Sequence, residues 1–514
     1  MNVKLFTIVI SALCVTCCLG ILIPASDAIN DIHNTRSILS DSGHLSKPNV
    51  IAMLKNRSVT TTNPGTGSKI PVITPDPTPT PEFSPIGQMK SNISQYVSQK
   101  KPSQMASIVS VIKSQTIQSG KPTASSISEN GKAMVEANNQ FAIDYYSQLA
   151  NDYGSTDKNI FFSPWSISSA FALTYEGARG ETAEEIQSVF HFPTTDATRR
   201  DGYSELISGL NIGRTGYTLY TANALWAEKT YPFLPDYISI ANRYYDAETT
   251  NLDLGNNSEG SRQIINQWVE EKTKNKIKDL IHEGGIDLYT VLVITNAIYF
   301  KGTWVKQFDT EKTVEEDFVL DSGATVKVPM MQRTDEDAIF GYAETDTFQV
   351  LRMPYVHKKG DALSMLVLLP KDNPLEALET SLTAEGIADL NQKLSDKRVF
   401  VYFPRFALDT GYQLSGTLSD MGMPRAFIWG NADFSGMDGT RSLFIDEVFH
   451  KAFVEVNEEG TEAAAATAGT IAMGGEILPE PIPVFRADHP FLFLIQDDDT
   501  GNILFMGRVV NPAG

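Results

Sequence analysis

Between residues 133 and 177 the apolar positions recur every three or four residues, the period of a helix with one buried face. The segment AMVEANNQFAIDYYSQLA (residues 133–150) predicts a first helix. A short apolar run then leads into Ser163 and Pro164. Serine favours a helix N-cap and proline the first helical position, so we predict a second helix that starts here and stops at Gly177.

Two further helix signals follow. Thr182 and Glu185 have the spacing of a capping box, which predicts that another helix starts at this point. The segment INQWVEEKTKNKIKDLI (residues 265–281) has the apolar spacing of an amphipathic helix. The first half of the folded region is therefore expected to be mainly helical.

After residue 290 the pattern changes to apolar runs bounded by Gly, Pro and Asp, which predict strands. The clearest are TVLVITNAIYFKGTW, FQVLRMPY, LSMLVLLP, RVFVYFPRFAL and the hairpin PFLFLIQ-DDDTGN-ILFMGRV. The three aspartates of that hairpin lack the alternating spacing of a calcium loop and indicate a solvated turn. Helices first and strands later, without βαβ alternation, favour one α+β domain over residues 131–514.

Residues 1–28, MNVKLFTIVISALCVTCCLGILIPASDA, have a lysine followed by a long apolar run and then small and polar residues. This pattern predicts a secretory signal cleaved after Ala28, or a membrane anchor if the run is retained. The protein is expected to be extracellular or tethered to the cell surface. All three cysteines (Cys14, Cys17 and Cys18) lie in this run. Cys17 or Cys18 could carry a lipid, but we favour the simpler interpretation that they are ordinary apolar residues of the signal segment. The exported part therefore has no disulfide and depends on a large core.

Residues 29–130 contain TTTNPGTGSKIPVITPDPTPTPEFSP and then a stretch rich in Ser, Gln and Lys. Such segments cannot bury enough apolar surface to offset their chain entropy, so we predict a disordered spacer. Asn56, Asn92 and Asn256 lie in N-x-S sequons, which carry glycans only in a host that attaches them.

Composition and motifs argue against several function classes. The formal net charge of −20 disfavours nucleic acid, because phosphate contacts need clustered Lys and Arg. The chain has no nucleophile elbow, zinc-protease motif or phosphate loop, and its seven histidines are scattered. A dispersed Ser/His/Asp triad remains open, since its members need not be adjacent. We expect no catalytic residues, no metal and no cofactor.

The segment NEEGTEAAAATAGT (residues 457–470) contains almost no large side chain, although strand-like segments of the same domain flank it. A long alanine helix is disfavoured by the glycines and threonines, and the segment has no apolar stripe for docking. In a strand, Thr461, Ala463, Ala465, Thr467 and Gly469 would share one face, and all of them are small. Such a strand could enter an existing sheet without displacing its core, and a glycine at position 460 would let the chain double back first.

Many motifs in one order resemble the serpin superfamily of serine protease inhibitors. They are FFSPWSISSAFALTYEGARGETAEEI, NQWVEEKTKNKIKDLI, TNAIYFKGTW, LVLLP, FPRFAL, MGMPRAF, VNEEGTEAAAATAG, DHPFLF and FMGRVVNP. The resemblance covers residues 133–512. It implies three β-sheets with eight or nine helices, and an exposed reactive-centre loop over residues 458–483 that baits a protease.

The family's inhibitory hinge requires Gly and Thr followed by small residues, which implies an inhibitor here. The hinge residues implied are Glu458, Gly460, Thr461, Glu462, Ala463, Ala464, Ala465 and Ala466. The resemblance also implies a "shutter", where the central sheet parts, at Ser163, Pro164, Ser166, Asn296 and His450. It implies a "breach", where the loop enters, at Gly302, Trp304, Phe308, Thr313, Arg405 and Glu458, with an Arg405–Glu458 ion pair. His450 taken alone is more typical of a satisfied core histidine.

The family usually places the cleaved bond about seventeen residues beyond the acid that precedes the hinge. Counting from Glu458 gives Met473–Gly474 or Gly474–Gly475. The loop is longer than usual, so Glu476, Ile477 and Leu478 remain less favoured candidates. None of these is Arg or Lys, which indicates an elastase-, chymotrypsin- or subtilisin-like target and disfavours a trypsin-like one.

The resemblance implies a monomer that forms a covalent acyl complex with a serine protease, and a cysteine protease remains open as the target. Cleavage would be followed by insertion of the loop into the central sheet. The alternative is a non-inhibitory member, such as a carrier or chaperone, whose loop is cut without trapping.

Overall fold

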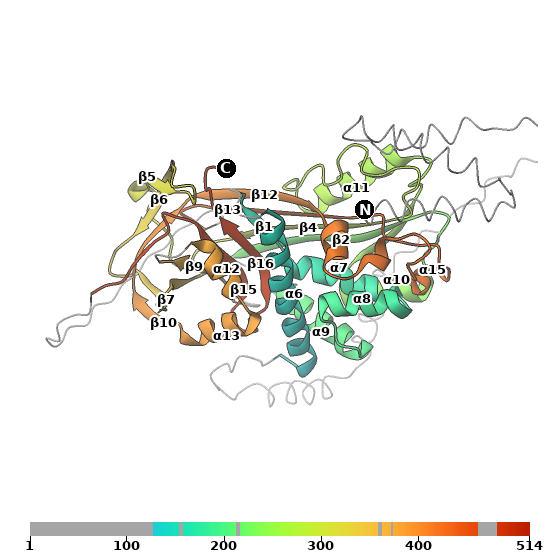
Figure 1. The fold of residues 1–514 in the computed structure, drawn as a ribbon, viewed down its shortest axis with the longest axis horizontal. Helices are drawn as coiled ribbons and strands as arrows, with labels where there is room; N and C mark the ends of the chain where they lie inside the picture. Colours follow the sequence, from blue (N-terminus) through green and yellow to red (C-terminus); the bar gives the residue numbers. More distant parts are fainter. Residues whose placement is uncertain (1–126, 154–157, 212–215, 358–361, 372–373, 461–480) are drawn as a thin grey trace, which may run out of the picture. The chain divides into compact units, whose positions relative to one another are not determined.

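The structure, a computed structural model, describes residues 127–153, 158–211, 216–357, 362–371, 374–460 and 481–514. The predicted signal or anchor segment and nearly all of the predicted spacer lie outside these ranges. The described part of the chain combines helices with three β-sheets, so the predicted α+β class is confirmed (Figure 1).

The described residues contain ten α-helices, where the resemblance implied eight or nine. The four shortest have only four to seven residues, which explains the difference in number. The helices are α6 (Glu129–Tyr153), α7 (Pro164–Gly177), α8 (Gly180–Phe190), α9 (Asp196–Asn211), α10 (Pro235–Ile240), α11 (Ser258–Lys272), α12 (Leu375–Ser381), α13 (Ala384–Lys393), α14 (Leu414–Asp420) and α15 (Ser435–Asp438). A π-helix, η1 (Ala241–Tyr245), continues α10, and two short 3₁₀ turns are η2 (Thr310–Lys312) and η3 (Pro424–Phe427).

One sheet has seven strands, another four, and the third five. The seven-stranded sheet has the order β1 (Ile160–Phe162), β16 (Ile503–Val509), β15 (Phe491–Asp497), β9 (Leu363–Pro370), β8 (Phe348–Pro354), β7 (Ile339–Glu344) and β10 (Ser395–Arg398). The four-stranded sheet has the order β14 (Val484–Arg486), β11 (Phe400–Pro404), β6 (Thr325–Arg333) and β5 (Val314–Val319). The five-stranded sheet, called the central sheet below, has the order β12 (Phe406–Gln413), β13 (Glu447–Val456), β4 (Leu292–Gly302), β2 (Tyr217–Glu228) and β3 (Glu248–Leu252).

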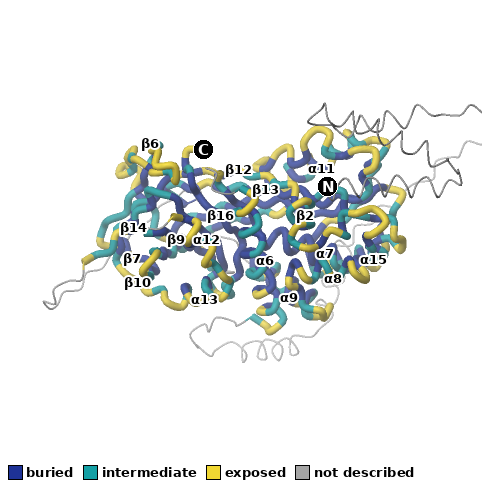
Figure 2. Tube along the Cα trace, viewed as in Figure 1, coloured by how far each residue is buried: buried dark blue, intermediate teal, exposed yellow. Residues whose placement is uncertain are grey.

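The middle strand of the central sheet, β4, is covered on both faces, whereas the edge strands β12 and β3 are partly exposed. Along β4 every residue except Lys301 is buried, which explains why its sequence is a continuous apolar run without alternation. One face contributes to the large core with α6 and α7, and the other packs Trp226 against Ile265 and Val269 of α11. Figure 1 shows α11 on one side of these strands and α6 to α9 on the other, and Figure 2 shows the buried residues concentrated between them.

Two helix starts have clear local causes. The Ser163 hydroxyl accepts a hydrogen bond from the Ser166 N–H (3.1 Å) and Pro164 follows it, so the predicted start of α7 and its end at Gly177 are confirmed. Helix α6 begins at Glu129, four residues before the predicted segment, because the Ser128 hydroxyl accepts from the Gly131 N–H (3.1 Å).

The predicted capping box at Thr182 and Glu185 is wrong. Helix α8 already begins at Gly180, and its N-cap, Arg179, makes no side-chain capping bond. The Thr182 hydroxyl accepts from the Asp433 N–H (3.0 Å), and Glu185 accepts from the Arg425 N–H (2.9 Å). Both side chains therefore hold a distant segment against α8 and do not cap the helix.

The predicted helix over residues 265–281 is also wrong at both ends. Helix α11 spans Ser258–Lys272, and the following residues form turns. Lys274 and Asn275 have φ angles of 54° and 59°, a left-handed conformation that stops a right-handed helix. The Thr273 hydroxyl stabilises the turn by accepting from the Ile277 N–H (3.2 Å).

Candidate functional site

The chain reverses direction directly after β13. Asn457 and Gly460 exchange two backbone hydrogen bonds of 3.1 and 3.2 Å. Gly460 has a φ of 111°, and a Cβ there would lie 2.4 Å from both the Gly302 carbonyl oxygen and the Trp304 nitrogen. Only glycine fits this conformation and this close approach. The prediction that a glycine lets the chain double back is confirmed.

The reversed segment binds the chain that leaves β4. The Trp304 N–H donates to the Glu459 carbonyl (3.0 Å) and the Phe308 N–H to the Glu458 carbonyl (2.9 Å). The Trp304 indole N–H donates to the Asn457 carbonyl (3.1 Å). The end of the described chain before the candidate loop is therefore fixed by backbone contacts at the end of β4.

Trp304 and Gly302 are tightly packed at the place where the reversed segment binds. Trp304 is 2% exposed and stacks on Tyr355 with 4.4 Å between ring centroids. A Cβ at Gly302 would lie 2.5 Å from the Tyr355 ring, so glycine permits the ring to sit there.

Strands β13 and β4 are parallel neighbours in the central sheet, and their hydrogen-bonded ladder ends before the strands do. Residues 447–453 of β13 pair with residues 293–299 of β4, and the last three residues of each strand extend beyond that ladder. Beyond them, Gly460 forms an isolated antiparallel bridge with Thr303. The strands are therefore already separated at the end where the reversed chain arrives.

An ion pair with Arg405 holds Glu458 at the end of the sheet where β13 and β4 have separated. Its side chain is 2% exposed and accepts from Arg405 Nε (2.7 Å), and Arg405 Nη2 completes the ion pair that the resemblance implied. Thr313 donates its hydroxyl to the other carboxylate oxygen. Burial raises the pKa of Glu458, but the bonds from Thr313 and Arg405 outweigh it and hold the pKa below its ordinary value.

We expect Arg405→Met to lower the free energy of unfolding by about 3 kcal/mol and Glu458→Gln by about 1 kcal/mol. The first leaves a buried carboxylate with Thr313 alone, whereas the second keeps that bond and leaves a half-exposed arginine in contact with water. The midpoint of guanidinium-induced unfolding measures both. The double variant should cost clearly less than the sum, and strict additivity would show that the pair is not coupled.

A second group of predicted residues meets beneath the central sheet. The His450 ring accepts from the Ser163 N–H through Nε2 (3.2 Å), and its Nδ1 bonds the Asn296 side-chain oxygen. The Asn296 amide donates to the Ser166 carbonyl (2.7 Å) and hydroxyl (2.8 Å). All four residues are at most 1% exposed. The start of α7, β4 and β13 are thus joined by one buried polar network.

The network also contains two residues that the sequence did not reveal. Asn223 of β2 accepts from the Asn296 amide (2.8 Å) and the Ser166 hydroxyl (3.0 Å), and donates to the Ser169 hydroxyl (3.0 Å). An asparagine beside the apolar second half of β2 was the available signal. The network therefore reaches three adjacent strands of the sheet.

His450 is fixed in its neutral form. Its Nε2 faces the Ser163 N–H and must accept a hydrogen bond from it. A protonated Nε2 would place its own N–H against that donor. Burial lowers the pKa of His450 from 6.5 to about 3, against a smaller raising effect of Asn296.

The unfolded chain therefore takes up a proton on this ring near pH 6.5, well before the folded protein does. The resulting stability is present above pH 6.5 and is lost as the pH falls toward 3, by roughly 1.4 kcal/mol per pH unit. Guanidinium unfolding at pH 6 and pH 5 should show a smaller loss for His450→Gln than for the wild type. The exposed His357→Gln is the control and should behave as the wild type does; equal slopes in all three proteins would contradict the assignment.

The remaining candidate residues fall outside the described ranges, so the structure does not place them. They are Thr461, Glu462, Ala463, Ala464, Ala465, Ala466, Met473, Gly474, Gly475, Glu476, Ile477 and Leu478. Within the described ranges no cluster of His, Cys, Asp and Glu could hold a metal ion. None of the helices described there is long and apolar enough to cross a membrane.

Comparison with known proteins agrees with this geometry. Residues 136–512 match the family described as serpin (serine protease inhibitor). A serpin-like protein of Thermococcus kodakarensis is 42% identical over 383 residues, 74% of this chain and 86% of that protein. The human leukocyte elastase inhibitor is 41% identical over 383 residues, 73% of this chain and 98% of that protein. Human thyroxine-binding globulin, solved with its hormone, is 32% identical with a TM-score of 0.66, covering 75% of this chain and 100% of that one. The chain belongs to the serpin family of serine protease inhibitors.

Proposed function

We propose that this serpin is a suicide inhibitor that traps a serine protease by inserting its cleaved loop between β13 and β4. The arrangement at the end of β13 carries the proposal. The chain reverses at residues 457–460 and arrives where the parallel strands have separated. A strand that continued from Gly460 would run antiparallel to both neighbours, a pairing slightly more stable than the parallel ladder it replaces.

The chemistry comes from the protease. Its serine attacks the carbonyl of the bait bond, at Met473–Gly474 or Gly474–Gly475, and forms an ester with the upstream fragment while the downstream amine leaves. The upstream fragment then inserts as a strand and carries the attached protease with it. Slowing deacylation about a million-fold requires ~8 kcal/mol, and the hydrogen bonds of a new central strand supply on the order of 10 kcal/mol.

The target is proposed to be an elastase-, chymotrypsin- or subtilisin-like protease, since no basic residue stands at the candidate bonds. The 41% identical relatives named leukocyte elastase inhibitor support this choice. The pattern of the N-terminal segment supports secretion or tethering at the cell surface. The inhibitor needs no cofactor for this mechanism.

Incubation with a panel of purified serine proteases tests the proposal. A target should form a 1:1 complex that survives SDS, and mass spectrometry of the released downstream peptide should identify the cut bond. The same protease with its catalytic serine changed to alanine is the control and should form no such complex. Loop cleavage without any complex across the panel would favour the non-inhibitory alternative.

A further inference from the structure

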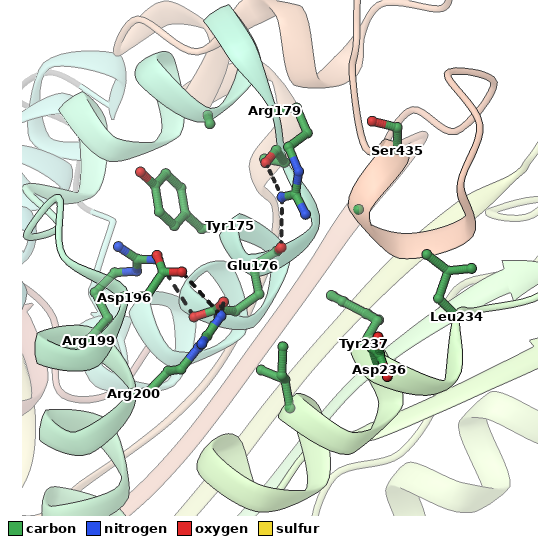
Figure 3. Close-up of a pocket in the computed structure, with 14 residues that line it drawn as sticks. Tyr175, Glu176, Arg179, Asp196, Arg199, Arg200, Leu234, Asp236, Tyr237 and Ser435 are labelled. Carbon is green, nitrogen blue, oxygen red and sulfur yellow. Dashed lines mark hydrogen bonds and ion pairs between the residues drawn. The ribbon is translucent and has the colours of Figure 1, made fainter.

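A cavity of about 410 Å³ lies between the end of α7, the start of α9, and α10 and α15. Figure 3 shows the charged side chains of α7 and α9 gathered on one side of it, with Leu234 and Tyr237 on another. The volume is within the range of small-molecule sites. None of the hinge, breach or shutter residues lines it.

Most of the charges around this cavity are already satisfied by one another. Glu176, 2% exposed at its side chain, accepts from Arg200 Nη2 (2.6 Å) and from the Tyr245 hydroxyl (2.7 Å). Arg199 pairs with Asp196, and its guanidinium lies 4.2 Å from the Tyr175 ring centroid. Both guanidinium groups are therefore engaged within the wall. Arg199 Nε is without a hydrogen-bond partner, but it is buried there.

Arg179 differs from the other two. Among the described residues no carboxylate forms an ion pair with it, although Asp433 is near enough that, against the raising effect of burial, Ser435, Arg441 and Arg179 together lower the pKa of Asp433. Its Nη1 donates to the Glu176 carbonyl (2.9 Å) and the Ala178 carbonyl (2.6 Å). Its Nη2 lies against Gly436, where an added Cβ would be only 2.3 Å away. The guanidinium is thus held in one orientation by two carbonyls and a glycine, while its Nε and Nη2 have no partner in the described part of the chain.

We propose that this cavity binds a small organic monocarboxylate, with its carboxylate on Arg179 and its apolar body against Leu234 and Ile240. A guanidinium with two adjacent free donors matches a carboxylate in a bidentate geometry. Three carboxylates, those of Glu176, Asp196 and Asp236, balance the three arginines of the lining. A singly charged ligand is therefore favoured over a phosphate ester, because the lining has no net positive charge to balance a second negative charge.

The proposed site is independent of loop insertion. Helix α7 has 14 residues, and the buried network of Ser163 and Ser166 lies at its other end, roughly 20 Å along the helix. Binding at this site can therefore be measured without a protease.

Titration calorimetry with hexanoate tests the proposal, with hexanamide as the uncharged probe and hexyl phosphate as the doubly charged one. Hexanoate should bind the intact protein 1:1 with a dissociation constant of about 1 mM, an affinity typical of one charge-assisted contact plus a short apolar chain. Hexanamide should show no saturable binding, and hexyl phosphate should bind more weakly than hexanoate.

Two variants locate the contact. Arg179→Gln should weaken hexanoate binding at least about tenfold, the loss of one charged hydrogen-bonding pair. Gly436→Ala retains every charge but displaces the guanidinium, and should weaken binding similarly. Its fold should survive, since the atom that must move is the end of a flexible side chain.

Arg243→Gln is the matched control, because Arg243 is an exposed arginine on the neighbouring η1 that does not line the cavity. It should bind hexanoate as the wild type does. Hexanoate binding that is undetectable, or unchanged by Arg179→Gln, would overturn the site. Tighter binding of hexyl phosphate would overturn its assignment to monocarboxylates.

Discussion

Thr461→Arg should convert this inhibitor into a substrate. In a strand that continues from Gly460, Thr461 is the first residue of the small-residue face, and an arginine there would have to be buried beside the separated ends of β4 and β13. Burying an unpaired charge costs several kcal/mol. An opposition of about 4 kcal/mol to insertion would slow it roughly a thousand-fold, so that deacylation wins. Gel analysis should show cleaved protein and free protease in place of the SDS-stable complex.

The neighbouring residue supplies the control. Glu462 would lie on the opposite face of such a strand, which is open to solvent at this end of the sheet, where Glu455 of β13 is exposed and Lys301 of β4 is only partly buried. Glu462→Arg therefore introduces the same side chain one position later without burying it on the small-residue face. This variant should still trap protease, as should Thr461→Ser. Trapping by Thr461→Arg at the wild-type stoichiometry would contradict the insertion mechanism, whichever protease is used.

Local chemistry was the part of this structure that the sequence predicted well. Ser163 and Pro164 act within one turn of helix, so their residue types alone predict the start of α7. Gly460 was predicted from the need for a reversal between two segments of one domain, and its φ of 111° has the same local origin. The order of motifs further predicted the Arg405–Glu458 pair, which joins positions 53 residues apart.

Contacts between distant segments account for the errors. Thr182 and Glu185 have the spacing of a capping box, but backbone donors at Asp433 and Arg425 compete for their oxygens and win. Asn223 was missed for a related reason, because nothing near it in sequence shows that Ser166 and Asn296 lie within reach. The sequence shows which polar side chains need a hydrogen-bond partner. It does not show which distant residue will supply that partner.

The cavity beside Arg179 shows the same limit. Within the matched motif GARGET, Arg179 stands immediately before α8, and the sequence pattern assigns no role to its side chain. Its significance depends on Gly436, more than 250 positions later, which lies against its guanidinium. Only the folded chain brings the charge, the glycine and the apolar wall together.

Cleavage of the loop should raise the melting temperature of the protein by about 10 °C or more. Before cleavage, β13 and β4 share a ladder over residues 447–453 and 293–299 and are separated beyond it. After cleavage, the upstream fragment can bond to both strands along its length, a gain on the order of 10 kcal/mol. For a domain of this size the unfolding entropy is roughly 0.8 kcal/mol per degree, so that gain corresponds to about 12 °C.

Differential scanning calorimetry of intact and nicked protein measures this shift, with nicking by a catalytic amount of a non-target protease that cuts within residues 461–480. Nicked Thr461→Arg is the control, because its loop is cut but its insertion is opposed, and it should gain much less. A gain of the same size in both proteins would assign the stabilisation to something other than a strand entering between β4 and β13. No gain in either would mean that the uncut fold is already the most stable arrangement, and a trap driven by relaxation of the sheet would then have no source of free energy.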